Sequence, residues 1–341
     1  MQISLRWYIY PVLFIVCILS GWQGVCAYPD SYQNANASGS ALAIDQPATL
    51  VITEESTEIS ETIGPVNNLT EKADDSLVEF VTPLGSLSER IAEIQALSVT
   101  SGTGSVIVAV LDTGIDKYHE DLAGVVIAEV NFTDSTTPED VYGHGTHVTG
   151  IIAAVNDNNV GIDGIVPDCR LLNVKVADDR GRCSMKALVQ GIYWAVDHGA
   201  LVINISIEMQ EHSLQLQQAI DYAWENGAIV IAAAGNGGCS VPVYPACYDN
   251  CIAVTAVKDN GELAPLANYG DWINAAAPGY KIYSTLPGDE YGPKYGTSFA
   301  AAYVSGLSAL LFPLMEDTNE NGRVNDEVWQ AIDSICGYNI M

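Results

Sequence analysis

Short apolar runs alternate with longer mixed segments from about residue 105 onward. The apolar runs that predict strands are residues 105–111, 124–130, 169–176, 201–206, 228–234 and 251–257. Continuous apolar runs of this kind are typical of strands that are buried on both faces of a parallel sheet. The segments 145–155, 184–198 and 213–225 between them predict helices. This alternation predicts an α/β fold, with a doubly wound, mostly parallel sheet and helices on both faces.

The first 85 residues follow a different pattern. Arg6 and the apolar stretch 8–19 precede small residues at Val25 and Ala27, which is the pattern of a secretory signal peptide. We therefore assign residues 1–27 to a signal peptide cleaved after Ala27; an uncleaved membrane anchor is the alternative. Residues 28–85 are acidic and rich in Ser and Thr, with one strand candidate at 49–53, and indicate a low-structure pro-segment or spacer. The compositional change predicts a folded domain over residues 86–341.

Charge narrows the range of functions. The chain of 341 residues carries 42 acidic against 13 basic side chains, a formal net charge of −29. Such a chain repels nucleic acids and anionic membranes and attracts cations. We expect no nucleic-acid partner, no membrane contact beyond the secretory signal, and a secreted protein.

Cysteine usage adds a second expectation. Removal of the signal peptide leaves Cys169, Cys183, Cys239, Cys247, Cys251 and Cys336. An even number in an exported chain predicts disulfides, with a local bridge among Cys239, Cys247 and Cys251. A zinc site is the competing interpretation, but no second Cys or His pair accompanies the two cysteines that are four residues apart.

The segment 295–306 places a serine before a run of small residues. Gly296 permits a turn that a side chain would block, and the alanines after Ser298 predict a thin, buried helix. The Ser298 hydroxyl then lies in the first helical turn, where free N–H groups favour negative charge. That position suits a nucleophile and also an ordinary N-cap serine.

Three further polar residues follow predicted strands or begin predicted helices. Asp112 ends the strand 105–111, His144 precedes a helix between two glycines, and Asn236 follows the strand 228–234 on a glycine turn. Each residue alone has an ordinary structural explanation, and His144 with His147 could be metal ligands. Ligands in doubly wound sheets bind beyond the carboxyl ends of the strands, so we expect these residues to meet there.

Four motifs in this order resemble the subtilisin-like serine proteases over residues 86–341. They are Asp112-Thr113-Gly114, His144-Gly145-Thr146-His147, Ala234-Gly235-Asn236 and Gly296-Thr297-Ser298. The order Asp, His, Ser differs from that of chymotrypsin-like enzymes and α/β-hydrolases. The resemblance implies that Ser298 is the nucleophile, His144 the base and Asp112 its orienting acid. It also implies that Asn236 and the Ser298 N–H stabilise the oxyanion, and that His147 is structural.

The activity that this resemblance implies is that of a secreted, monomeric serine endopeptidase with an acyl-enzyme intermediate and protein or peptide substrates. A non-catalytic binding module on the same fold and an esterase remain as alternatives. An extended cleft beside Gly181 and Ser206 favours a peptide, because a peptide backbone can pair there as an added strand.

Several cleft positions depart from the family pattern. Glu208 and Met209 replace two glycines that usually form one wall of the substrate cleft, and Gly235 is a further expected cleft residue. Either the loop is rearranged with activity retained, or an acidic rim favours basic residues in the substrate. Val243 replaces a glycine that some relatives have at the pocket floor, which predicts a shallow pocket.

Structural calcium is indicated twice. By resemblance, Asp121 with Asp157 and Asn158 matches a calcium site, with a polar turn as the alternative. Near the C-terminus, Asp317, Asn319 and Asn321 alternate and Gly322 is sixth, as in an EF-hand loop. The twelfth position is Val328 rather than Glu, so a loop that only caps the following helix is the alternative.

Overall fold

The computed structural model describes residues 41–43, 87, 90–92, 94–95, 106–166 and 168–338. The predicted signal peptide and the strand candidate at 49–53 lie outside these residues. Residues 87, 90–92 and 94–95 are helical, and Leu87 and Ile91 are buried in the core. The N-terminal boundary proposed at residue 86 therefore lies next to side chains that pack with the folded domain.

A seven-stranded sheet forms the centre of the molecule. Its strands are β2 (Ile107–Asp112), β3 (Val126–Asn131), β4 (Arg170–Lys175), β6 (Val202–Ile205), β7 (Ile229–Ala233), β8 (Cys251–Val257) and β9 (Ala275–Pro278). They are ordered β3-β4-β2-β6-β7-β8-β9, and every neighbouring pair is parallel. Consecutive residues of β6, β7 and β8 are all buried, because both faces of the sheet are covered. The predicted doubly wound α/β fold is confirmed.

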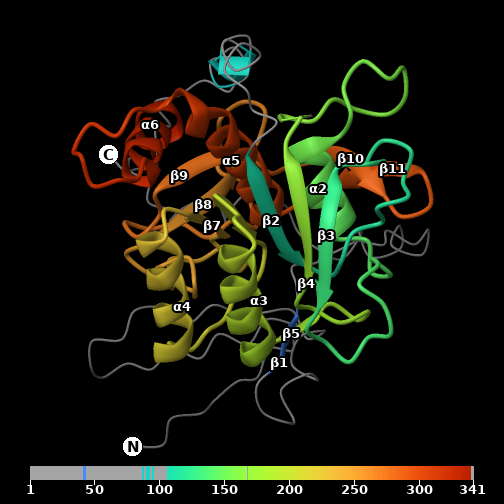
Figure 1. Cartoon of the computed structure of the whole chain (residues 1–341), viewed down its shortest axis with the longest axis horizontal. Coiled ribbons are helices and arrows are strands. Elements are labelled where there is room, and N and C mark those ends of the chain that lie inside the picture. Colours follow the sequence, from blue (N-terminus) through green and yellow to red (C-terminus); the bar gives the residue numbers. More distant parts are fainter. Residues whose placement is uncertain are drawn as a thin grey trace, which may run out of the picture.

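Helices cover the two faces of this sheet (Figure 1). Helices α3 (Met185–Asp197) and α4 (Leu214–Glu225) pack against one another on one face. Helices α2 (Gly145–Ala153), α5 (Thr297–Leu311) and α6 (Asn325–Cys336) lie on the other, followed after α5 by the short helix η4 (Phe312–Leu314). The sheet thus separates two hydrophobic clusters, one under α2 and α5 and the other under α3 and α4.

The central helix α5 fits its place because its residues are small. Ala300, Ala301 and Ala302 are fully buried, and a Cβ at Gly306 would lie 2.7 Å from Cβ of Ile165. The stretch Thr297–Leu314 is the one helical segment of the described chain that is long and apolar enough to cross a membrane, and it is 83% buried inside the protein. Its apolar character therefore reflects a place in the core.

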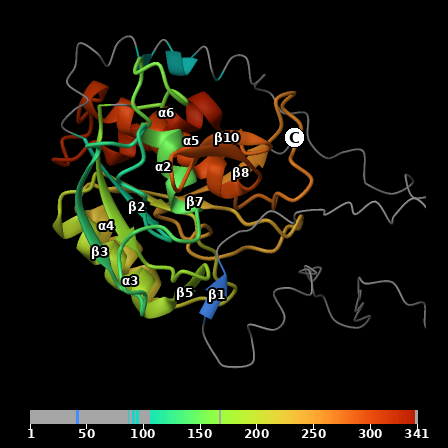
Figure 2. The same ribbon diagram turned by 90° about the vertical axis from the view of Figure 1, so that its right-hand side faces the viewer.

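Two small antiparallel pairs complete the fold. Strands β10 (Ile282–Leu286) and β11 (Glu290–Lys294) form a hairpin. Strand β5 (Arg182–Ser184) lies beside β1 (Ala41–Ala43) in Figure 2. The two strands are antiparallel, with Leu42 opposite Cys183. Within residues 28–85, β1 is the part that the structure describes.

Candidate active site

Asp112 and His144 meet at the carboxyl end of β2. The His144 Nδ1–H group donates to the Asp112 carboxylate, with Nδ1 2.8 Å from Oδ1 and 3.0 Å from Oδ2. The same Oδ1 accepts from the Thr113 N–H at 2.7 Å, and the Gly145 N–H donates to Thr113 Oγ1 at 3.0 Å. Both side chains are buried, so these polar contacts are shielded from water. The imidazole is therefore fixed with its Nε2 atom directed away from Asp112.

Asp140 holds the two loops that carry these residues together, and sequence reasoning missed it. It is 5% exposed. Its Oδ1 atom accepts hydrogen bonds from Thr113 Oγ1 at 2.8 Å and from the Gly143 N–H at 2.7 Å. Its Oδ2 atom accepts from the N–H and the Oγ1 of Thr146, at 2.9 and 2.7 Å. Because it accepts from the first turn of α2, it acts there as a helix cap. An acid shortly before a helix start was the available signal.

Two lysines, the buried Lys175 and the half-buried Lys294, hold backbone carbonyls of the same loops. Lys175, which lies opposite Asp112 in the sheet, donates to the carbonyls of Thr113 and Glu139. Lys294 on β11 donates to the Gly143 carbonyl at 2.8 Å, and burial lowers the pKa of its ammonium group while Asp140 and Asp112 oppose that shift. The loops at residues 113 and 139–143, both ahead of His144 in the chain, are therefore each held by a lysine ammonium group.

Ser298 begins the central helix α5, as predicted. Gly296 before it has φ 152° and ψ 158°, a backbone conformation that favours glycine. On one side of Ser298, the Thr297 N–H donates to Asn236 Oδ1 at 2.9 Å. On the other side, the Phe299 ring lies 5.5 Å from the His144 ring, centroid to centroid. The two neighbours of Ser298 thus bring Asn236 and His144 to the same helix start.

Two buried nitrogen atoms at this helix start have no hydrogen-bond partner within the described part of the chain. They are Nε2 of His144 and Nδ2 of Asn236. The first can accept a proton and the second can donate a hydrogen bond. Buried polar atoms are normally satisfied, so such an unsatisfied pair beside a serine indicates that both groups meet a ligand.

His147 has a different environment from His144. Its ring Nε2 lies 3.0 Å from the Gly292 carbonyl, to which it can only donate, and its ring packs edge-on against Phe299. Burial lowers the pKa of His147 to about 3. A neutral, packed histidine matches the structural role that the resemblance implied.

The five predicted cleft residues differ in what they contact, and Gly181 directly precedes the strand β5. Gly181 has φ 72°, and a Cβ there would collide with the Tyr142 ring. Ser206 Oγ donates to the Ser298 carbonyl at 3.5 Å. Glu208 lies against Gly235, directly before Asn236, and Val243 is 2% exposed. Val243 thus packs in the core beneath these segments.

The predicted calcium ligands form two separate groups. Asn158 Nδ2 donates to Asp121 at 2.7 Å, and Asp157 lies in the same turn with φ 58°. In the C-terminal loop, Asp317 accepts from the Asn321 and Gly322 N–H groups at 3.1 and 2.7 Å. The described residues contain no cluster of three or more His, Cys, Asp or Glu side chains suited to a metal. A cation in either place would therefore need amide or backbone oxygens in addition to carboxylates.

The predicted local disulfide does not form. Cys247 and Cys251 are free thiols, as are Cys169, Cys183 and Cys336. A bridge among Cys239, Cys247 and Cys251 needs at least one of the two free thiols, so that prediction was wrong. Proximity along the chain had been the only argument for it, and Cys251 instead lies inside β8 with its thiol in the core.

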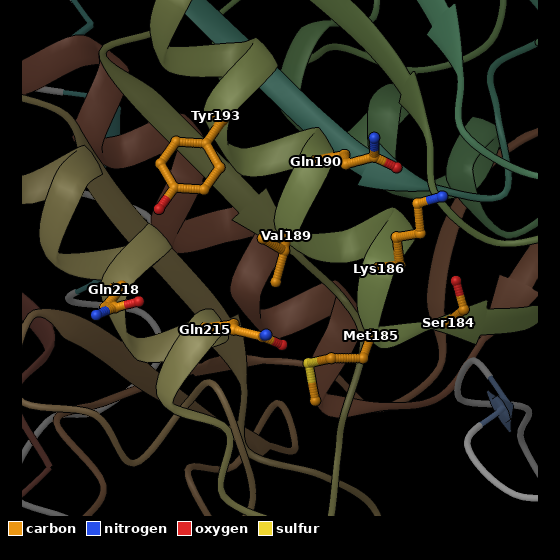
Figure 3. Close-up of a pocket in the computed structure, with 8 residues that line it drawn as sticks. All are labelled: Ser184, Met185, Lys186, Val189, Gln190, Tyr193, Gln215 and Gln218. Carbon is orange, nitrogen blue, oxygen red and sulfur yellow. The ribbon is translucent and has the colours of Figure 1, made fainter.

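A surface pocket of about 540 Å³ lies between α3 and α4, away from Ser298. Met185, Val189 and Tyr193 of α3 and Gln215 and Gln218 of α4 line it (Figure 3). Ser184, Lys186 and Gln190 complete the lining, which contains neither a histidine nor a carboxylate. The pocket thus lacks a pair like Asp112 and His144, and the candidate site remains the cluster around Ser298.

A comparison with known proteins decides the family. The model of the subtilase family matches residues 103–324, which is more than half of the chain. The chain belongs to the subtilase family. Its curated relatives include Thermophilic serine proteinase of Bacillus sp. (strain AK1), 43% identical over 239 residues, and thermitase of Thermoactinomyces vulgaris, 42% identical over 224 residues. Subtilisin DY of Bacillus licheniformis is 37% identical over 238 residues.

The aligned parts differ in their share of each relative. The alignment with the Bacillus proteinase covers 70% of this chain and 58% of that relative. The alignment with thermitase covers 65% of this chain and 80% of thermitase, and that with subtilisin DY covers 67% of this chain and 86% of subtilisin DY. The match begins at residue 103 and includes all four motifs, so the family assignment rests on the folded domain and its candidate site. Subtilases are serine-type endopeptidases, and members of the family typically bind calcium.

Proposed function

We propose that this subtilase is a secreted serine endopeptidase that hydrolyses peptide bonds of protein or peptide substrates. The carrying observation is the pair of unsatisfied buried atoms, His144 Nε2 and Asn236 Nδ2, on either side of Ser298. A serine hydrolase needs a proton acceptor and an oxyanion donor at these two positions. The hydrogen bond from His144 to Asp112 supports the same assignment.

In the proposed mechanism, Ser298 attacks the substrate carbonyl and His144 Nε2 accepts its proton. Asp112 keeps the Nδ1–H tautomer and stabilises the imidazolium without taking the proton. The oxyanion is met by Asn236 Nδ2 and the Ser298 N–H. Asn236 is pre-oriented, because its amide oxygen already accepts from Thr297. The imidazolium then protonates the leaving amine, and water hydrolyses the acyl-enzyme by the reverse steps.

The edge of β5 favours a peptide over a small ester as substrate. Strand β5 follows Gly181 and pairs with β1 in antiparallel register, so its backbone groups can bind an extended segment. A peptide bound along this edge would gain main-chain hydrogen bonds that a small ester lacks. This contact supports the assignment of an endopeptidase rather than an esterase.

The assignment is tested by three proteins: the wild type, Ser298→Ala and Asn236→Ala. We expect a fluorophosphonate to label the wild type at Ser298, and casein to be cleaved in preference to a small ester. Ser298→Ala should nearly abolish turnover, whereas Asn236→Ala should leave a folded enzyme that is roughly 10²–10³-fold slower, the cost of this donor in the related subtilisin. Cleavage by Ser298→Ala at the wild-type rate would show that the triad is wrongly assigned.

Export and maturation belong to the same proposal. The N-terminal pattern supports a signal peptide of residues 1–27, and the acidic segment 28–85 supports a pro-segment or spacer ahead of a monomeric domain. Mass spectrometry of the protein from culture medium should find its N-terminus at residue 28 or later. Size-exclusion chromatography with light scattering should give the mass of one chain.

Calcium is proposed for the C-terminal loop, where the residues fit it better than at Asp121. Asp326 Oδ1 and Glu327 Oε2 are buried oxygens without a hydrogen-bond partner in the described chain. Asn319 and Asn321 both contact the other oxygen of Asp326, so these side chains converge with Asp317 on one loop. A calcium ion there would be held by carboxylate and amide oxygens and would stabilise the start of α6.

A further inference from the structure

The segment that follows β6 runs past the proposed nucleophile in a fixed position. Ser206 contacts the Ser298 carbonyl. Three residues later, Met209 forms a two-way backbone bridge with Tyr244, with N–O distances of 2.7 and 2.8 Å. Glu208 lies between these two anchors. Its backbone therefore has little freedom to move away from Ser298.

The side chain of Glu208 crosses toward the loop that carries Asn236. A Cβ placed on Gly235 would collide with Glu208 Oε2, so the carboxylate contacts the backbone of the residue just before Asn236. Ile207 and Met209 are 1% and 3% exposed, whereas Glu208 is only half-buried. Glu208 Oε2 is therefore buried against the backbone of Gly235, while the residue as a whole keeps some exposed surface.

The proposed mechanism fixes where the substrate side chain must go. The scissile carbonyl carbon lies at Ser298 and its oxygen points to Asn236, so the residue on the acyl side is held by both. Its side chain leaves between the two segments that converge there, residues 206–208 and 234–236. Glu208 spans that space. A side chain entering it therefore meets the carboxylate of Glu208.

We propose that Glu208 makes this subtilase selective for lysine or arginine on the acyl side of the scissile bond. The inference rests on the proposed function and names its substrate class. The stem of a lysine or arginine can pack along Gly235 while its cationic group pairs with the carboxylate, in a charge-assisted hydrogen bond. An uncharged side chain of the same length would desolvate the carboxylate further without supplying a positive charge, and an acidic one would be repelled.

The test compares peptides that differ only at the acyl-side residue. Lysine, arginine, norleucine and glutamate are placed there, and kcat/KM is measured for the wild type, Glu208→Gln and Glu211→Gln. Norleucine has the lysine stem without the ammonium group. Glu211 is an exposed acid three residues further on, so Glu211→Gln makes the same change in net charge outside the cleft.

We expect the wild type to cleave the lysine peptide at least about tenfold better than the norleucine peptide. Glu208→Gln should reduce that ratio to near one, whereas Glu211→Gln should keep it. If the preference for lysine came only from the overall negative charge of the protein, both variants would lower the lysine-to-norleucine ratio equally. Equal cleavage of the lysine and norleucine peptides by the wild type, or an unchanged ratio in Glu208→Gln, overturns the proposal. The wild-type comparison decides even if a variant does not fold.

Fluorophosphonate labelling separates this outcome from a failure of the proposed function. If Ser298 is labelled and peptides are cleaved without a preference for basic residues, the endopeptidase assignment stands and the role of Glu208 is wrong. If Ser298 is not labelled and no peptide is cleaved, the proposed function itself fails, and the selectivity fails with it.

Discussion

At the scale of single residues, the candidate site depends on side chains that hold loops rather than on those that would react. Asn268 is fully buried and accepts from the Gly237 and Cys239 N–H groups at 3.0 and 3.2 Å. It also donates to the Ala234 carbonyl at 2.8 Å. These bonds enclose the turn that presents Asn236, so Asn268 is a positioning residue for the proposed oxyanion donor.

Asn268→Ala should lower kcat by about 10- to 100-fold with little change in KM, because an oxyanion donor acts mainly in the transition state. In the Asn236→Ala background the same change should have little further effect on kcat, because the donor it positions is already absent. Full additivity of the two effects would show that Asn268 acts on another part of the protein. Thermal unfolding of each variant controls for loss of fold.

The neutral His147 gives a second residue-scale prediction, in this case on stability against pH. Its pKa is about 3 in the folded protein, against an ordinary value of 6.5. Below pH 6.5 the unfolded chain binds a proton that the folded protein does not. This residue should therefore cost about 2 kcal/mol of stability between pH 7 and pH 5.

His147→Gln should reduce this loss, because glutamine can still donate to the Gly292 carbonyl but does not titrate. Urea unfolding at pH 7 and pH 5 measures it, with Ser298→Ala as the common background to prevent self-cleavage. The same loss of stability in both proteins would show that His147 does not titrate on unfolding in this range.

At the scale of elements, the loop of residues 317–324 before helix α6 turns sharply, as an ion-binding loop does. Glu320 and Gly322 both have positive φ, 59° and 84°, so that alternate side chains face inward. The carboxylate of Asp326, in the first turn of the helix, contacts Asn319 and Asn321. The loop and the helix start thus form one unit, whose stability would be coupled to a bound cation.

Millimolar calcium should raise the melting temperature of the protein, and EDTA should reverse the rise. Asp326→Asn should remove most of the effect, because it deletes a charged ligand. Asp333→Asn serves as the control, since it makes the same charge change at an exposed position of the same helix. A calcium-induced rise that survives in Asp326→Asn would place the ion elsewhere, and no rise in the wild type would contradict the proposed site.

The sequence predicted elements well where their signal was local. Strands such as β7 and β8 were visible as apolar runs because both faces are buried. The hairpin β10–β11 was missed because its residues alternate in exposure and include Gly292 and Pro293. At the site, Asp112, His144, Asn236 and Ser298 were found through motifs. Lys175 and Asn268 were not, because each acts on backbone groups that only the folded chain brings near. Asp140 was missed although its place shortly before a helix start was a local signal.

At the scale of the whole molecule, one sheet divides the protein into two cores. The α5 side contains the start of the proposed nucleophile helix, and the α3–α4 side supports the strand β5 and the segment after β6. Neither core contains the site alone. Ser298 is next to Phe299 of the core on the α5 side, and Ser206 is next to Ile207 of the core on the α3–α4 side. The candidate site therefore exists only while both layers are packed on the sheet.

The four buried free cysteines lie on both sides of this division. Cys169 and Cys336 belong to the core on the α5 side, and Cys183 and Cys251 to the core on the α3–α4 side. Burial raises the pKa of all four thiols, to about 12 for Cys169 and Cys336, so each is inert toward alkylation while its layer stays closed. The protein thus contains a natural reporter in each half. The order in which these thiols become reactive under mild denaturation would reveal which half opens first, without any introduced label.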